Sequence, residues 1–86
     1  MSFKAPGKSI SPIEVTNISR HGIWLLSHER EQFMSYEEFP WFRDASVGQI
    51  LNVREVSPGH FHWPDLDVDL TAEMIEHPAR FPLKAQ

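Results

Sequence analysis

Residues 13–36 read IEVTNISRHGIWLLSHEREQFMSY, and this stretch decides the expected fold. It opens with β-branched residues that alternate with polar ones, which is typical of a half-buried strand. A turn at His21-Gly22 and a short apolar run follow, and a further apolar run can pair back after a polar tip. We therefore predict three strands in an antiparallel meander, over 13–20, 22–27 and 32–36.

Short helices are expected after this meander. Pro40 interrupts an aromatic run and cannot continue a regular ladder, which predicts a tight turn or a 3₁₀ segment. Ser46 is a candidate N-cap for a helix that ends near Leu51, and Thr71 can cap a last helix that ends before Pro78.

A second hairpin is expected between these helices, from strand-like residues at 52–56 and at 60–70. The order β-β-β-α-β-β-α predicts an α+β domain, in which one small antiparallel sheet carries short helices packed on one side. We expect a flexible arm at 1–12, a single domain over 13–83 and a tail at 84–86.

Composition narrows the class of protein. Eighty-six residues leave room for one core, and 41% hydrophobic and 12% aromatic residues are too many for a disordered chain. The absence of cysteine excludes disulfides, thiolate zinc sites and cysteine nucleophiles. No apolar run approaches the roughly 20 residues of a membrane span, and the first residues lack the apolar core of a signal peptide. We expect a soluble, cytoplasmic protein with no membrane partner.

Charge is unevenly distributed along the chain. The formal net charge is -4, and residues 37–86 carry four Lys/Arg against nine Asp/Glu, a balance of 4 - 9 = -5. A nucleic-acid partner is therefore disfavoured, because such proteins usually carry a clustered basic excess. The acidic half suits either a solvated surface or a partner with a basic surface.

The densest group of polar side chains lies in residues 59–70, GHFHWPDLDVDL. In one extended strand, Asp65, Asp67 and Asp69 would face solvent, while Leu66, Val68 and Leu70 would face the core. Calcium loops of the D-x-D-x-D type need glycine at the sixth position, where this sequence has Leu70, so a calcium site is disfavoured.

The same stretch offers a mixed nitrogen and oxygen metal site formed by His60, His62 and Asp65. The opposing interpretation is that these are ordinary exposed histidines of an edge strand. No nucleophile has an evident partner, and so small a chain has little volume for a catalytic pocket. We expect no cofactor, no metal and no catalytic residue, and keep a small metal-dependent protein or enzyme as the alternative.

Aromatic residues can serve either as core or as anchors for a protein partner. Most are expected in the core, but the Phe39-Pro40-Trp41-Phe42 turn cannot direct all its aromatics inward. The candidate partner surface therefore comprises Trp41, Trp63, Asp65, Asp67 and Asp69.

Three motifs carry a resemblance to a known family. They are Phe39-Pro40-Trp41-Phe42, Ile50-Leu51-Asn52-Val53 and the stretch from Trp63 to Leu70, WPDLDVDL. With these motifs the chain resembles the bacterial DUF2442 family over roughly Glu14 to Leu83. The resemblance implies a small α+β protein, in many cases encoded beside another small protein in what looks like a toxin-antitoxin arrangement. Some members add a helix-turn-helix at the C-terminus; we expect none here, which disfavours direct DNA binding, and no catalytic residue of the family can be carried over.

The function expected from the residues and the resemblance is a non-enzymatic protein-interaction module. It would be the neutralising, antitoxin-like member or the regulatory member of a two-protein bacterial pair, with the product of an adjacent gene as its partner. A homodimer is also expected, because pairing across a two-fold axis would hide an exposed sheet edge.

Overall fold

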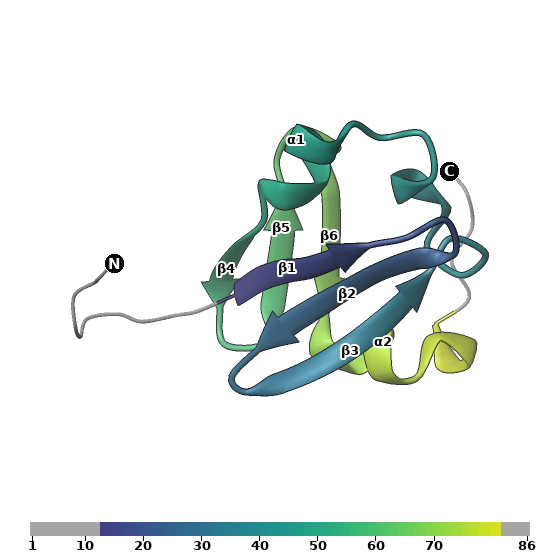
Figure 1. Ribbon diagram of the computed structural model, residues 1–86. Coiled ribbons are helices and arrows are strands. Elements are labelled where there is room, and N and C mark those ends of the chain that lie inside the picture. Colours follow the sequence, from purple (N-terminus) through teal and green to yellow (C-terminus); the bar gives the residue numbers. More distant parts are fainter. Residues whose placement is uncertain (1–12, 82–86) are drawn as a thin grey trace.

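The computed structural model describes residues 13–81, which form two small antiparallel sheets and two short α-helices (Figure 1). The α+β class expected from the sequence is confirmed. The arm expected at 1–12, the last two residues of the expected domain and the tail expected at 84–86 lie outside the described residues.

The first sheet is the expected meander of β1 (Ile13–Ile18), β2 (Gly22–Ser27) and β3 (Arg30–Ser35). The β2–β3 pair runs in unbroken register, whereas β1 has an irregularity between Val15 and Asn17. The turn between β2 and β3 places His28 and Glu29 at positive φ.

The second sheet contains β4 (Arg54–Ser57), β5 (His60–Trp63) and β6 (Val68–Thr71). The prediction of one sheet with a continuous strand over 60–70 is wrong. The chain turns at 64–67, with Asp67 at φ 55, so that β6 pairs back on β5. Proline cannot donate to a ladder and aspartate tolerates the left-handed region, so both residue types suit a turn here.

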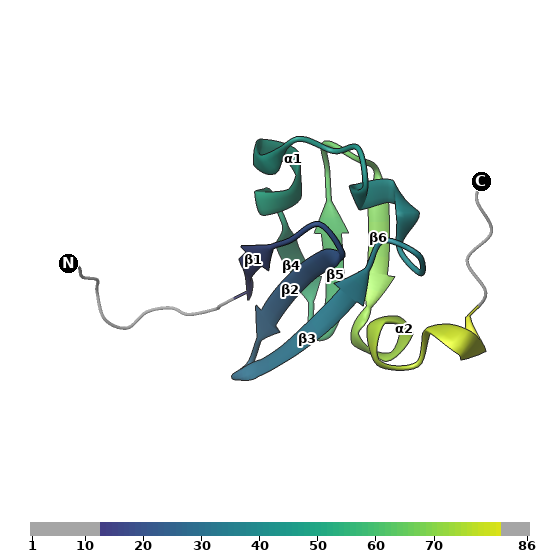
Figure 2. The same cartoon turned by 45° about the vertical axis from the view of Figure 1, so that its right-hand side comes forward.

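Helices connect and follow these strands. The 3₁₀ helix η1 (Pro40–Phe42) forms where Pro40 predicts it, and α1 (Val47–Leu51) begins with a capping box of Ser46 and Gln49. The helix α2 (Ala72–Glu76) has Thr71 as its N-cap, as expected, and a 3₁₀ helix η2 (Pro78–Arg80) follows. The helices do not share one side of a sheet: α1 packs against β1 at one end of the molecule, and α2 packs against β3 and β6 at the other (Figures 1 and 2).

The core lies between the two sheets, which cross one behind the other (Figure 2). Both sheets contribute alternate residues to it, and η1, α1 and α2 add further apolar side chains. Its fully buried members are Ile23, Leu25, Met34, Phe39, Phe42, Ile50, Phe61, Trp63 and Leu70. None of the helices among residues 13–81 is long and apolar enough to cross a membrane.

Candidate functional site

Three of the five residues expected on a partner surface line one open hollow of about 430 Å³. Trp41 comes from η1, Asp67 from the turn between β5 and β6, and Asp69 from β6, and Leu66 and Val68 complete the lining. We call this site the acidic hollow.

Local structure explains how Trp41 reaches the hollow. Phe39, which precedes η1, and Phe42, the last residue of η1, are both buried, and Phe42 packs edge-on against Trp63 with ring centroids 4.9 Å apart. A single 3₁₀ turn cannot bury every aromatic of the run, so Trp41 is left half-buried at the surface. One aromatic of this turn is therefore exposed in part, as the sequence indicates.

The alternation of buried and exposed residues along β6 explains why a charged side chain faces the hollow. In β6, Val68 and Leu70 are buried and Asp69 between them is exposed, as the sequence predicts for these three residues. Asp65 and Asp67 are exposed too, although they belong to the turn rather than to a strand. The hollow thus combines an indole and a leucine with two solvent-facing carboxylates, which suits a cation on an aliphatic stem such as lysine or arginine.

Trp63 does not belong to this surface. Its side chain is 0% exposed, and its Nε1 donates a hydrogen bond to Ile50 O at 2.9 Å. It shares the inward face of β5 with Phe61, because residues two apart on a strand point the same way. Its placement on the candidate partner surface is therefore wrong. The i, i+2 spacing of Phe61 and Trp63 is the sequence signal for its burial.

Asp65 also lies outside the hollow. Its Oδ2 accepts a hydrogen bond from Asn52 Nδ2 at 2.9 Å, which ties the turn after β5 to the residue that ends α1. Asp65 thereby supports the turn that places Asp67.

The two histidines of β5 meet Asp69 rather than Asp65. His62 Nδ1 lies 2.8 Å from Asp69 Oδ1, and His60 Nε2 lies 3.8 Å from the same oxygen. Within residues 13–81, no group of three His, Cys, Asp or Glu side chains could hold a metal ion. The expected trio of His60, His62 and Asp65 is thus not brought together, and both histidines instead contact the carboxylate of Asp69, a residue that lines the hollow.

A second polar cluster, which sequence reasoning missed, joins the two sheets. His28 Nε2 lies 3.0 and 2.8 Å from the two carboxylate oxygens of Glu55, and Gly59 N donates to Glu55 Oε2 at 2.8 Å. Burial by itself would raise the pKa of Glu55, but the Gly59 hydrogen bond and His28 outweigh it and hold that pKa below its ordinary value. His28 and Glu55 are far apart in the sequence, so local patterns give no signal of their contact.

The match to a family model extends over residues 12–81, that is, over the whole of the described fold. The description of that family is "Protein of unknown function (DUF2442)". No curated protein and no solved structure shows significant similarity to the chain. The matched region contains both sheets, η1, the acidic hollow and the three motifs of the resemblance. Because the match covers most of the sequence, the chain belongs to the DUF2442 family.

Proposed function

We propose that this protein is a non-enzymatic interaction module that binds a basic segment of a protein partner in the acidic hollow. The observation that carries the proposal is that Trp41, Asp67 and Asp69, from separate elements, line the same hollow. Lysine or arginine from the partner would place its aliphatic stem against Trp41 and Leu66 and its charge between the two carboxylates.

The charge distribution favours such a partner. The half of the chain that contains the hollow carries the excess of nine Asp/Glu over four Lys/Arg. Complementary charge across an interface speeds encounter and suppresses wrong partners. We further propose that the protein is the neutralising, antitoxin-like or regulatory member of a two-protein bacterial pair, with the product of an adjacent gene as the first partner to test.

The metal-dependent alternative has less support. Asp65 is engaged by Asn52, and His60 and His62 share the single carboxylate of Asp69. Melting curves with added zinc, nickel or manganese discriminate the two functions, because a metal that binds the folded state raises the melting temperature. We expect no shift with any of the three metals, and a saturable rise would favour the alternative.

Binding to the purified neighbouring gene product tests the proposal. The double variant Asp67→Asn, Asp69→Asn should raise Kd at least about tenfold and flatten its salt dependence, because the removed charges are those that the partner pairs with. The charge-matched control is Glu14→Gln with Glu29→Gln, two exposed residues of the other sheet and its β2–β3 turn. The control should bind within about twofold of the parent, and equal loss in both variants would contradict the proposal.

We also propose a homodimer formed through the outer edge of β3. Two outer strands, β3 and β6, pair with their neighbours in unbroken register, and β3 is the longer, with six residues against four. The outer strands β1 and β4 carry irregularities that discourage edge pairing. Light scattering should give twice the chain mass of 10.0 kDa, and a mass near 10.0 kDa at high micromolar concentration would contradict the dimer.

A further inference from the structure

The arginines of the described chain divide into paired and unpaired groups. Arg30 Nη2 lies 3.1 Å from Glu76 Oε2, and Arg80 Nη1 lies 3.2 Å from Glu73 Oε2. The other three form no ion pair with any residue of 13–81, and two of them, Arg20 and Arg43, line one pocket of about 340 Å³. Unpaired guanidinium groups thus gather at one place in a protein whose net charge is -4.

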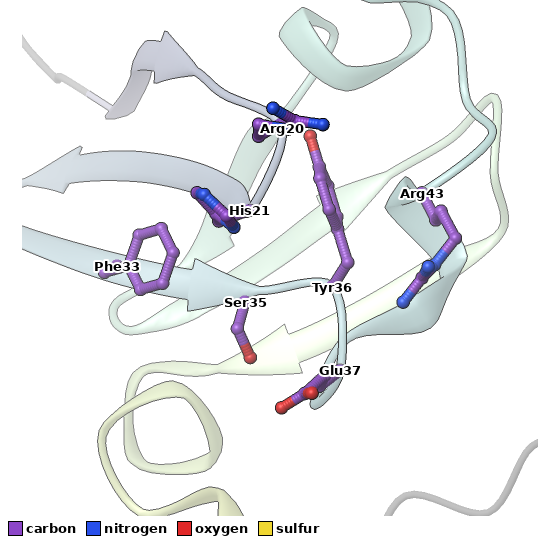
Figure 3. A pocket seen from close by; sticks show the side chains of 7 residues that line it. All are labelled: Arg20, His21, Phe33, Ser35, Tyr36, Glu37 and Arg43. Atoms are coloured by element: carbon purple, nitrogen blue, oxygen red, sulfur yellow. The ribbon is translucent and has the colours of Figure 1, made fainter.

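Three segments far apart in the sequence build this arginine pocket (Figure 3). Arg20 and His21 come from the turn between β1 and β2, Arg43 follows η1, and β3 with the residues after it supplies the remainder. In Figure 3 the ring of Tyr36 stands between the side chains of the two arginines. The complete lining is Arg20, His21, Phe33, Ser35, Tyr36, Glu37 and Arg43.

Hydrogen bonds hold these segments together without using the arginine side chains. Tyr36 N donates to His21 O at 3.0 Å, and the Tyr36 hydroxyl donates to Ser19 O at 2.7 Å. Arg43 N donates to Pro40 O at 3.1 Å and closes the turn of η1. The backbone around the pocket is therefore fixed, and the guanidinium groups of Arg20 and Arg43 remain available to a ligand.

Charge and shape define the ligand class. Two guanidinium groups against the single carboxylate of Glu37 leave the pocket formally positive, and the guanidinium fork matches the oxygens of a carboxylate or phosphate. Phe33 adds an apolar wall: this residue is 40% exposed, and the centroid of its ring lies 5.1 Å from that of Trp24. We propose that the arginine pocket binds a small organic anion in which a carboxylate or phosphate is attached to an apolar ring.

Calorimetric titration with phenyl phosphate, benzoate and inorganic phosphate tests this site. The two aromatic probes distinguish phosphate from carboxylate, and inorganic phosphate shows what the oxyanion contributes without the ring. At least one aromatic probe should bind once per chain with a Kd that is roughly millimolar, as expected for a ligand of this size. It should also bind more tightly than inorganic phosphate, and no saturable binding of either aromatic probe would overturn the proposal.

Arginine variants locate the binding. Arg20→Gln and Arg43→Gln should each weaken the aromatic probe about tenfold, because each removes charge-assisted hydrogen bonds. Arg54→Gln is the matched control, since Arg54 is the third unpaired arginine and lies on β4, outside the pocket. It should change Kd by less than about twofold, and a loss equal to that of the pocket variants would overturn the proposal.

Phe33→Leu provides an independent check. It should abolish the preference for the aromatic probe over inorganic phosphate and leave the affinity for inorganic phosphate unchanged. A preference that survives in Phe33→Leu would contradict the role of the aromatic wall. None of these residues lines the acidic hollow, so this site and the proposed partner site can fail separately.

Discussion

The two sheets have the same topology but present different outer faces. Each is a three-stranded antiparallel meander whose inward residues enter one common core. On the outer face of the first sheet, Trp24 and Phe33 lie with ring centroids 5.1 Å apart. On the outer face of the second sheet, His60 and His62 surround the carboxylate of Asp69. The inward faces can therefore be understood by packing alone, and the features available to ligands and partners differ between the outer faces.

The largest expected loss of stability is on the inward face of the second sheet, and a variant in the acidic hollow gives the comparison. Trp63→Ala should cost about 3 to 5 kcal/mol of unfolding free energy, because Trp63 is fully buried and its indole is hydrogen bonded to Ile50 O. Trp41→Ala should cost clearly less, because Trp41 is half-buried, and should instead weaken partner binding. Urea unfolding and the binding assay measure the two effects, and equal destabilisation by both variants would contradict the assignment.

A pair of glycine variants compares the first sheet with α1. A methyl group on Gly22 would overlap the carbonyl oxygen of Met34 and lie 2.8 Å from Ser35 Cα, so Gly22→Ala should cost about 1 to 3 kcal/mol. A methyl group on Gly48 would meet nothing within 4 Å, and Gly48→Ala should stabilise the protein by about 0.5 to 1 kcal/mol because alanine favours the helix. Thermal unfolding measures whether each variant raises or lowers the stability of the protein. A stabilising Gly22→Ala would show that β2 and β3 lie farther apart than in this structure.

Local patterns predicted the parts of the fold that depend on neighbouring residues. The β-branched alternation after Ile13 and the turn at His21-Gly22 gave the first sheet, and Ser46 and Thr71 cap their helices as expected. The break at 64–67 was missed because apolar and polar residues continue to alternate through it. Alternation alone cannot show that Asp67 adopts a positive φ.

Sites assembled from distant segments were predicted least well. The sequence named Trp41, Asp67 and Asp69 as surface candidates by residue type, but that residues from η1 and β6 line one hollow became visible only in the fold. The contact of His28 with Glu55 and the arginine pocket both join segments that are far apart in the sequence. No periodic pattern along the chain predicts such contacts. The prediction that Trp63 lies on the surface was wrong, because Trp63 is two residues from Phe61 on β5 and shares its inward, buried face.

An intermediate effect concerns the carboxylate that joins the sheets. Because the pKa of folded Glu55 is lowered, its ionised form stabilises the fold above about pH 4.3, the ordinary value for glutamate, and this contribution is lost as pH falls through the folded pKa. Glu55→Gln should therefore be less stable than the parent by about 1 kcal/mol at pH 7, with a smaller difference at pH 3. Chemical unfolding at both pH values measures this, with Glu14→Gln as an exposed control on β1. A difference that is unchanged at pH 3 would contradict the role of ionised Glu55.

The smallest effect belongs to the outer face of the second sheet. Asp69 does not cap α2, because Thr71 Oγ1 accepts the hydrogen bond from Met74 N and Asp69 contacts the histidines of β5. The Asp69 side chain is 58% exposed, so Asp69→Asn should change the unfolding free energy by no more than about 0.5 kcal/mol at pH 7. A loss of about 2 kcal/mol in urea unfolding would mean that Asp69 is structural and would weaken its assignment to a partner surface.

The most direct test of the acidic hollow as a binding surface is an NMR titration of the labelled protein with the purified neighbouring gene product. We predict that the indole N–H of Trp41 and the amides of Leu66 to Asp69 shift on binding, and that the buried indole N–H of Trp63 serves as the internal reference. Saturable shifts centred on Trp24 and Phe33, with Trp41, Asp67 and Asp69 unmoved, would place the partner on the first sheet and contradict the account.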